Sequence, residues 1–413
     1  MPRGEVVAIT GCGVVTPLGH DPDTLFDALC AQRSAIAPLP PPLAQRLTSP
    51  VAARVVDFDP AAHFDPPRLR LLDRATQFAL VAAQAALRAA GIELARCDRH
   101  RCGVAVGTGM AGAQSSDDGF RSLYGEHDER VKPYSVLLAM NHAAAAWIGI
   151  DHGLRGPSLT ISTACSSSAV AIGEAARRVA AGEVDLMLAG GTEAPLALGS
   201  LKAWEALRTL APMAADPATS CRPFALDRAG MVLAEGAAFV VLERAAHAQA
   251  RGATPLARLA GYGLTTDVEH ITRPSVAGQA AAMQAALDDA QLAPSAIDYL
   301  NAHGTGTQAN DAVETAAIRQ VFGAHARDLA VSSTKSMHGH LLGAGGALEF
   351  VIALQALRRR TAPPTAHLRV PDPACDLDYV ASGPRPLRAG GGAVMSSSFA
   401  FGGTNAVLIA SAA

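Results

Sequence analysis

Strand-like and helix-like segments alternate along almost the entire chain of 413 residues, and this alternation most constrains the fold. Repeated strand–helix units predict mostly parallel sheets covered by helices, with functional sites at the carboxyl ends of the strands. The pattern begins again after residue 251, and one sheet is too small for this many strands. We therefore expect two halves, residues 1–251 and 252–413. The clearest expected strands are 6–10, 103–106, 159–162, 237–243, 256–261, 297–301 and 393–397, and the clearest expected helices are 21–30, 69–90, 166–181, 275–290 and 343–357.

The composition excludes several classes of protein. Hydrophobic residues make up 49% of the chain and charged residues only 17%, which is the composition of a packed core and not of a disordered chain. A net charge of −3 gives no overall positive field for nucleic acid or an anionic membrane. We see neither a membrane-spanning apolar segment nor a signal-peptide region, so we expect a cytoplasmic protein. Seven scattered cysteines without a Cys-x-x-Cys pair argue against disulfides and structural zinc.

Cys165 follows a predicted strand and stands where a helix would start, in the segment Thr-Ala-Cys-Ser-Ser at 163–167. Unpaired backbone N–H groups at a helix start favour a thiolate over a thiol, and they can hold the oxyanion of an attacked thioester. A lone cysteine is more often a small buried apolar residue, which is our interpretation of the other six. Cys165 is therefore a candidate nucleophile.

Two further polar motifs follow predicted strands. In Asn-Ala-His-Gly-Thr-Gly-Thr at 301–307, glycine lets the backbone approach a ligand, and Thr305 and Thr307 can hydrogen-bond a polar chain beside His303. A capped surface loop is the alternative interpretation. The segment Lys-Ser-Met-His-Gly-His at 335–340 carries two histidines, but no local carboxylate or cysteine completes a ligand set, so we expect no metal. The Walker spacing of a phosphate-binding loop is absent.

Together with Ser-Phe-Ala-Phe-Gly-Gly-Thr-Asn at 398–405, these three motifs resemble those of the β-ketoacyl-[acyl-carrier-protein] synthases, most closely the type II elongating enzymes. The order and spacing of the four motifs agree with the family, and the resemblance covers essentially the whole chain. It implies an α/β, thiolase-like fold in which two similar halves stack as a five-layered αβαβα sandwich. It also implies decarboxylative Claisen condensation of an acyl group with malonyl-acyl carrier protein, in fatty-acid or type II polyketide or polyene elongation.

The resemblance assigns roles to the catalytic residues. The acyl group would be held on Cys165, while neutral His303 and His340 would donate hydrogen bonds to the malonyl thioester and stabilise the enolate. Lys335 would act in support, by orienting His303 or Glu314 through charge-assisted hydrogen bonds. The supporting acidic positions of the family fall on Glu314 and Glu349.

The resemblance also implies how substrates are bound. Backbone N–H groups of Cys165 and Phe401 would form the oxyanion hole, and Phe401 would gate the acyl chain. Thr305 and Thr307 would bind phosphopantetheine, which the acyl carrier protein carries, so no cofactor of the enzyme's own is expected. The expected partners are this acidic carrier and a second subunit, in a homodimer or in a heterodimer with a related ketosynthase-like subunit. A local basic patch should receive the carrier; the candidates are Arg68, Arg70, Arg74, Lys132, Lys202 and Arg208, with Glu205 opposing them.

Four positions depart from the pattern of the elongating enzymes. Met110, in the expected acyl pocket, replaces a smaller branched residue, and Leu201 stands where an aromatic residue is common. His338 and Ala400 also replace the usual residues. Because one methylene changes pocket selectivity by only about 1–3 kcal/mol, such exchanges predict an acyl specificity different from that of housekeeping fatty-acid elongation.

Other classes fit the sequence less well. A non-catalytic subunit of the chain-length-factor type is the main alternative, but it would lack the nucleophile Cys165. A chalcone-synthase-like enzyme would pair its cysteine with histidine and asparagine, so His340 argues against it. A thiolase would need a second catalytic cysteine near the C-terminus, whereas Cys375 is expected in a loop. A non-enzymatic scaffold would not require four polar motifs in an apolar chain.

Overall fold

The computed structural model describes residues 5–388 and 392–413, and the first half of the chain supplies one five-stranded part of its sheet. This part has the order β1-β7-β6-β4-β5, in which β1 and β7 pair antiparallel and β4 runs parallel to both β6 and β5. Residues 1–4, where a signal peptide was judged absent, lie outside the described residues. The strands are β1 (Val7–Val15), β4 (Cys102–Gly107), β5 (Ser158–Ile161), β6 (Leu186–Glu193) and β7 (Gly236–Arg244).

The second half repeats this arrangement. Its order is β8-β14-β13-β9-β10, so in both halves the first strand is followed by the fifth, fourth, second and third strands of that half. The antiparallel and parallel pairings also recur in the same positions. The strands are β8 (Ala257–Thr266), β9 (Ile297–Asn301), β10 (Ala330–Ser332), β13 (Ala393–Phe399) and β14 (Thr404–Ser411).

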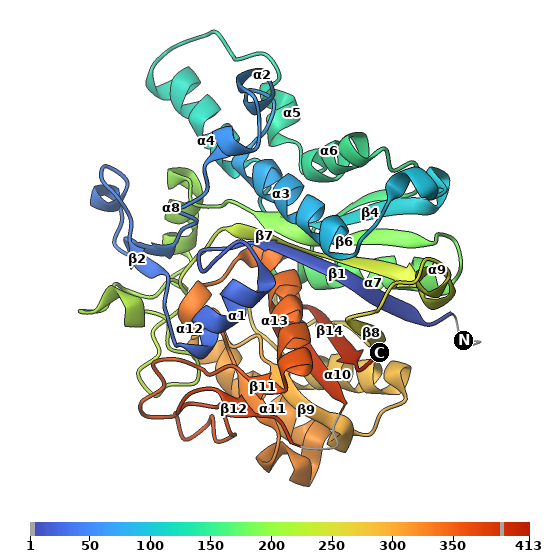
Figure 1. The fold of residues 1–413 in the computed structure, drawn as a ribbon. Helices are drawn as coiled ribbons and strands as arrows, with labels where there is room; N and C mark the ends of the chain where they lie inside the picture. The colour runs from blue at the N-terminus through green and yellow to red at the C-terminus, as the bar shows by residue number, and fades with distance from the viewer. Residues whose placement is uncertain (1–4, 389–391) are drawn as a thin grey trace.

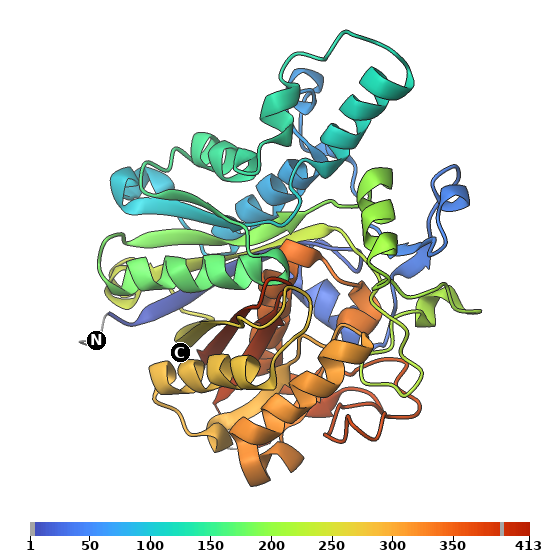
Figure 2. The same cartoon turned by 180° about the vertical axis from the view of Figure 1, so that it is seen from behind.

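Helices complete five layers, as Figures 1 and 2 show. Helices α3 (Arg74–Ala89) and α6 (Ala143–His152) pack on the outer side of the first half, and α10 (Val276–Ala290) and α11 (Gln308–Phe322) lie on the outer side of the second. Between the halves lie α7 (Ser167–Ala180) and α13 (Gly345–Arg359), which contact each other and strands of both halves. The predicted α/β fold of two similar halves is therefore confirmed.

The two halves share more than a surface. Strands β1 and β8 pair antiparallel across the middle, from Val7 opposite Leu259 to Ile9 opposite Ala257, and α13 packs against β7. Every residue of α13 from Gly345 to Leu357 is buried. The division into domains at residue 251 stays a prediction, because hydrogen bonds and core packing cross it.

Shorter elements surround the sandwich. Helices α4 and α5 stand at the top of Figures 1 and 2, away from the ten-stranded sheet. In the described residues no helix is long and apolar enough to cross a membrane. The short elements are α1 (Pro22–Cys30), α2 (Pro66–Leu69), α4 (Ala113–Phe120), α5 (Ser135–Ala139), α8 (Leu198–Ala206), α9 (Ala245–Ala250), α12 (Lys335–His338), β2 (Ile36–Pro38), β3 (Val51–Ala53), β11 (Thr361–Ala362) and β12 (Arg385–Pro386).

The helix expected at 69–90 begins later than predicted. The side chain of Asp73 accepts a hydrogen bond from the backbone of Ala75, so Asp73 is the N-cap and α3 begins at Arg74. The preceding turn, α2, is a separate element. At the other end Gly91 has a φ of +62°, the left-handed conformation predicted for a helix stop.

A glycine pair on the first strand of each half repeats at residue level. A Cβ added to Gly13 of β1 would lie 2.3 Å from the carbonyl oxygen of Ala82 in α3. A Cβ added to Gly263 of β8 would lie 2.0 Å from the carbonyl oxygen of Ala282 in α10. Gly11 and Gly261 make the matching approaches one helix turn further on. Each outer helix thus packs directly on a strand backbone.

We predict that Gly13→Ala lowers the free energy of unfolding by about 1–3 kcal/mol, because the added methyl group overpacks the contact between β1 and α3. The measurement is denaturant unfolding followed by circular dichroism. Gly119→Ala in α4 is the control, since an added Cβ there meets no atom within 4 Å. Equal stability of the two variants would contradict this view of the packing.

Candidate active site

Cys165 lies in a tight turn between β5 and α7. The preceding residue, Ala164, has a φ of +50°, which is uncommon for a residue with a side chain. The hydroxyl of Ser167 accepts a hydrogen bond from Thr163 N at 2.9 Å and donates to Ala164 O at 2.6 Å, so it stabilises the turn. The turn places Cys165, only 7% exposed, two residues before Ser167, the first residue of α7.

Two histidines from the second half meet this cysteine. The Nε2 atom of His340 lies 3.1 Å from the Sγ atom of Cys165. The rings of His303 and His340 contact edge to face, with their centroids 5.4 Å apart. Nδ1 of both histidines is buried and has no hydrogen-bond partner among the described residues. The structure therefore brings the three predicted residues together, with unused polar atoms around the sulfur.

Burial controls the protonation of this cluster. It raises the pKa of Cys165 to about 12, against the opposing effects of Lys335 and of the Phe401 backbone N–H, which hydrogen-bonds the sulfur. Burial and the Lys335 cation together hold the pKa values of His303 and His340 well below their usual range. The free protein thus holds a thiol beside two neutral imidazoles. The expectation of a resting thiolate is wrong, because desolvation outweighs the groups that stabilise the anion.

Lys335 is fully buried between a carbonyl and a carboxylate. Its ammonium group donates a hydrogen bond to the backbone carbonyl of His303 at 2.6 Å and forms an ion pair with Glu349 of α13. The expected contact with His303 is therefore present through the backbone. The alternative contact with Glu314 is absent, because Glu349 is the acidic partner of Lys335.

Glu314 holds the same loop from another side. Its two carboxylate oxygens accept hydrogen bonds from the backbone N–H groups of His303, at 2.7 Å, and Gly304, at 2.8 Å. Burial raises the pKa of Glu314 to about 7 even though these bonds lower it. The two acidic residues implied by the resemblance thus fix the backbone of His303, directly or through Lys335.

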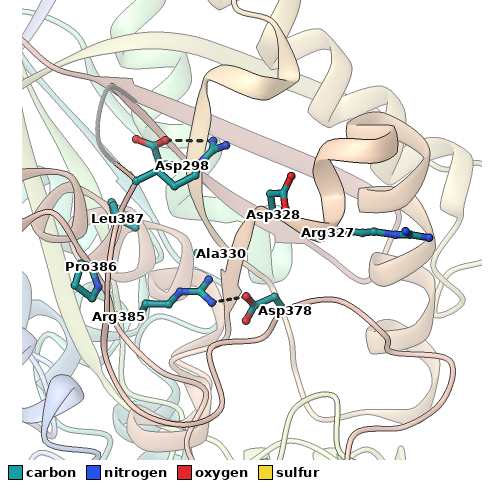
Figure 3. A pocket seen from close by; sticks show the side chains of 9 residues that line it. Asp298, Arg327, Asp328, Ala330, Asp378, Arg385, Pro386 and Leu387 are labelled. Atoms are coloured by element: carbon teal, nitrogen blue, oxygen red, sulfur yellow. Dashed lines mark hydrogen bonds and ion pairs between the residues drawn. The ribbon is translucent and has the colours of Figure 1, made fainter.

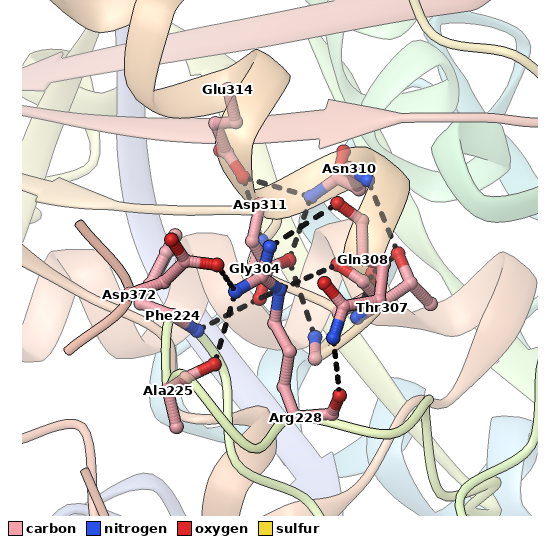
Figure 4. Close-up of polar contacts among 12 residues, drawn as sticks. Phe224, Ala225, Arg228, Gly304, Thr307, Gln308, Asn310, Asp311, Glu314 and Asp372 are labelled. Carbon is pink, nitrogen blue, oxygen red and sulfur yellow. Dashed lines mark hydrogen bonds and ion pairs between the residues drawn. The ribbon is translucent and has the colours of Figure 1, made fainter. Parts of the chain in front are cut away.

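Arg228, which we did not identify from the sequence, binds the backbone at the end of the loop that carries His303 (Figure 4). This buried side chain donates to the backbone oxygens of Thr307, at 3.1 Å, and Gln308, at 3.2 Å, and forms an ion pair with Asp372. The amide of Gln308 donates back to the Arg228 carbonyl at 2.8 Å. An isolated arginine in a loop has no sequence pattern that would reveal such a role.

Glu193 is a second functional residue that sequence reasoning missed. At the end of β6 its buried carboxylate accepts backbone hydrogen bonds from Gly109 at 2.7 Å, Met110 at 2.8 Å and Gly343 at 3.0 Å. Burial raises its pKa to about 7. Glu193 therefore joins loops of both halves beside Cys165.

A cavity of about 60 Å³ is lined by Cys165, His303 and His340. The hydroxyls of Thr305 and Thr307, both in its wall, hydrogen-bond each other at 2.8 Å. They thus lie on the approach to the sulfur, where the resemblance puts phosphopantetheine. The wall also includes Met231, Phe399, Ala400, Phe401 and residues 271–274.

The residues expected to form the acyl pocket pack in one apolar cluster. Leu201 is buried in the cluster that contains Cys165, and Met110 and Ala400 pack against it. His338 faces elsewhere, since its ring nitrogens contact Gly339 O at 2.7 Å and Thr334 Oγ1 at 2.9 Å. Of the four departures from the family pattern, three therefore lie in or against the apolar cluster that contains Cys165.

A larger cavity of about 510 Å³ lies apart from this cluster (Figure 3). Its described lining contains neither cysteine nor histidine, and four of its charged residues form two ion pairs. Arg385 forms an ion pair with Asp378, and Arg388 forms one with Asp298 at 3.4 Å. The catalytic residue types are found at the smaller cavity.

The expected absence of a metal ion and the docking of the carrier protein both stay predictions. One ligand atom each from Cys165, His303 and His340 lies within 4.8 Å of the others, a spacing that a metal ion could use. In the expected basic patch, Arg74 is paired with the buried Glu235 and Lys202 with Glu205, which leaves fewer free cations than the sequence suggests.

Comparison with known proteins decides the family. The model of the beta-ketoacyl synthase N-terminal domain matches residues 4–248, and that of the C-terminal domain matches residues 256–369. The chain belongs to the β-ketoacyl synthase family. It is 44% identical to nodulation protein E of Rhizobium leguminosarum bv. trifolii, covering 97% of this chain and 98% of that protein. It is 42% identical to 3-oxoacyl-[acyl-carrier-protein] synthase 2 of Coxiella burnetii, covering 98% of each.

Solved structures agree with this assignment. A beta-ketoacyl synthase from Burkholderia phymatum superposes with a TM-score of 0.92 at 36% identity, covering 99% of this chain and all of that one. A type II polyketide ketosynthase, solved with its acyl-carrier protein, superposes with a TM-score of 0.91 at 30% identity over the full length of both chains. The β-ketoacyl synthase is thus a condensing acyltransferase that forms β-ketoacyl-acyl carrier protein. The non-catalytic alternative is not favoured.

Lys335→Met should destabilise the synthase by about 3–5 kcal/mol, because it leaves the carboxylate of Glu349 buried without its cation. The pKa of Glu349, already raised by burial to about 7, should rise further. A carboxyl group whose folded pKa exceeds its unfolded pKa loses stability as the pH rises, so the loss should be larger at about pH 8 than at about pH 6. Thermal unfolding at both pH values measures it.

The control for this prediction is the double variant Lys335→Met, Glu349→Leu. It removes both charges, so its stability should fall less between about pH 6 and about pH 8 than that of Lys335→Met, because no carboxyl group with a raised pKa remains at position 349. A single variant that unfolds at the same temperature at both pH values would contradict the buried ion pair.

Proposed function

We propose that Cys165 is the residue that holds the acyl group during condensation. The observation that carries this proposal is the 3.1 Å contact between its sulfur and His340 Nε2, at the start of α7 and beside His303. A thiol becomes a nucleophile when an adjacent base removes its proton. The low pKa of His340 leaves the imidazole neutral and able to accept that proton.

In the first half-reaction, Cys165 attacks the thioester carbonyl of acyl-acyl carrier protein. His340 Nε2 takes the proton of the thiol and returns it to the departing phosphopantetheine thiolate, so one thioester is exchanged for another. The backbone N–H groups of Cys165 and Phe401 hold the oxyanion. The backbone N–H of Phe401 already donates a hydrogen bond to the Cys165 sulfur in the structure.

In the second half-reaction, malonyl-acyl carrier protein loses CO₂ and its thioester becomes an enolate. Between the half-reactions the neutral His340 ring changes tautomer: Nε2 takes a proton from solvent and Nδ1 gives one up to solvent. His303 and His340 then donate hydrogen bonds to the enolate oxygen. The enolate carbon attacks the acyl carbonyl on Cys165, the carbon–sulfur bond breaks, and the thiol regains one proton from solvent. Burial and, after it, the charge of Lys335 keep both imidazoles neutral, which preserves one N–H and one lone pair on each.

Thr305 and Thr307 bind the phosphopantetheine arm, and Phe401 gates the acyl chain. Support comes from their place in the wall of the cavity that reaches Cys165. The carrier supplies the arm, so the reaction needs no cofactor of the enzyme's own. The cytoplasm is the proposed location, and the elongated chain belongs to fatty-acid or type II polyketide synthesis.

A second ketosynthase-like subunit, identical or related, completes the assembly. Strand β5, which leads to Cys165, is an edge strand with unpaired backbone groups. The arm formed by α4 and α5 exposes large apolar side chains, with Phe120 62%, Tyr124 71% and Val136 68% exposed. One solved relative is described as a ketosynthase/chain length factor, and another as a ketosynthase in complex with its acyl-carrier protein.

Substitutions of the three central residues should separate the half-reactions. Cys165→Ala abolishes acyl loading and condensation, because no nucleophile remains. His303→Ala retains loading but slows CO₂ release from malonyl-acyl carrier protein by about 100-fold or more, the usual effect of losing one hydrogen bond to a developing oxyanion. Mass spectrometry of the protein measures loading, and release of labelled CO₂ measures decarboxylation.

Far-ultraviolet circular dichroism of each variant is the control for folding. Full condensation activity in Cys165→Ala would overturn the proposed nucleophile. An equal loss of loading and decarboxylation in His303→Ala would point to general structural damage instead of the proposed role.

A further inference from the structure

The gate residue Phe401 touches an aromatic ring of the other half of the molecule. The Trp204 ring, on α8, lies parallel to the Phe401 ring, with centroids 6.1 Å apart and planes inclined by 24°. Both side chains are only half-buried. Aromatic pairs are attractive at such separations, so the contact stabilises the position of Phe401 seen in the structure.

Trp204 is fixed in place by its neighbour in the chain. The carboxylate of Glu205 accepts hydrogen bonds from the backbone N–H groups of Thr48, at 2.6 Å, and Ser49, at 2.8 Å. These bonds and the ammonium of Lys202 outweigh burial and lower the pKa of Glu205 to about 2, so the carboxylate stays charged at neutral pH. Helix α8 is thereby attached to Thr48 and Ser49, and Trp204 on this helix stacks on the Phe401 ring.

The gate itself stands on a tight turn. Phe401 lies between β13 and β14, followed by Gly402 and Gly403 with φ of +83° and +80°. Trp204 also packs against the apolar cluster that contains Cys165, together with Ala400 of the same turn. The stacked pair of Trp204 and Phe401 therefore connects the apolar cluster around Cys165 to the turn that carries the gate residue.

The cavity at Cys165 must widen before a long acyl chain can enter. Its volume of about 60 Å³ is far below the roughly 300–1,000 Å³ of pockets that enclose larger ligands. Phe401 forms part of its wall. The cavity would widen if the Phe401 ring moved away from Trp204.

We propose that Trp204 is a specificity-determining residue, which holds the Phe401 ring in the closed position and sets how readily long acyl chains reach Cys165. This inference rests on the proposed roles of Cys165 and Phe401. Chains long enough to displace the ring must break the stack, whereas short chains need not. The stack thus selects by chain length without touching the reacting atoms.

Rates of Cys165 acylation test this inference in Trp204→Ala and Trp204→Phe. Loss of one aromatic pair should accelerate loading from hexadecanoyl-acyl carrier protein about 2- to 10-fold in Trp204→Ala. Loading from butyryl-acyl carrier protein should change less. Trp204→Phe keeps an aromatic face and should retain slow loading of the long chain. The acyl mass on Cys165 is followed in single turnovers.

Fluorescence provides a readout that does not depend on turnover. The chain has 2 tryptophans, so Trp147→Phe leaves Trp204 as the sole indole emitter. Phe401→Ala in this background, or loading of the long chain, should shift the Trp204 emission, while butyryl loading should not. Thermal unfolding of Trp147→Phe checks that losing the contact between Arg68 and Trp147 leaves the fold intact.

The outcomes separate this inference from the function on which it rests. If Cys165 takes up no acyl group in the native protein, the proposed nucleophile fails. If Cys165 is acylated, but Trp204→Ala loads the long chain at the native rate or Trp204→Phe loads as fast as Trp204→Ala, the role of Trp204 is overturned. A Trp204 emission unaffected by Phe401→Ala would also overturn it.

Discussion

One buried cation holds the active site together. The ammonium of Lys335 donates to the backbone of His303, pairs with Glu349 in the central helix α13, and lowers the pKa values of both active-site histidines. An unpaired ammonium in this fully buried position would be costly, so the carboxylate and the carbonyl are needed together. The cation thus helps to hold the backbone of His303 in place and, together with burial, keeps both imidazoles neutral.

The repeated topology explains how the segment that carries Lys335 and His340 comes to lie beside Cys165. Cys165 follows the third strand of the first half and precedes α7, while His340 follows the third strand of the second half and precedes α13. The two central helices contact each other, so their first residues converge. Backbone clamps then fix the loops, because Glu193, Glu314 and the Arg228 guanidinium each bond main-chain groups. A duplicated fold has thus acquired different chemistry at two equivalent positions.

Local sequence signals predicted most of the fold and the central residues of the site. Strands and helices follow from periodicity. Small polar turns after predicted strands indicate Cys165 and His303, whereas the role of His340 follows only from the resemblance to the β-ketoacyl synthases. The helix start at Arg74 and the glycine pairs of β1 and β8 were missed, because each depends on a particular tertiary or capping contact. Contacts between residues far apart in the sequence could not be predicted either. Lys335 pairs with Glu349 and not with Glu314, and Phe401 stacks on Trp204. The protonated state of Cys165 depends on burial, which the sequence does not display.

The central claim is that one sulfur carries the acyl chain between two substrates. The most direct measurement loads the native protein with isotope-labelled acyl-acyl carrier protein, isolates it, and adds malonyl-acyl carrier protein. Peptide 156–177 from trypsin digestion contains Cys165 as its single cysteine, so its mass reports the acyl group. We expect the label to leave this peptide as one CO₂ and one labelled β-ketoacyl-acyl carrier protein appear for each acyl group lost. A label found on another residue, or discharged without CO₂, would contradict the account.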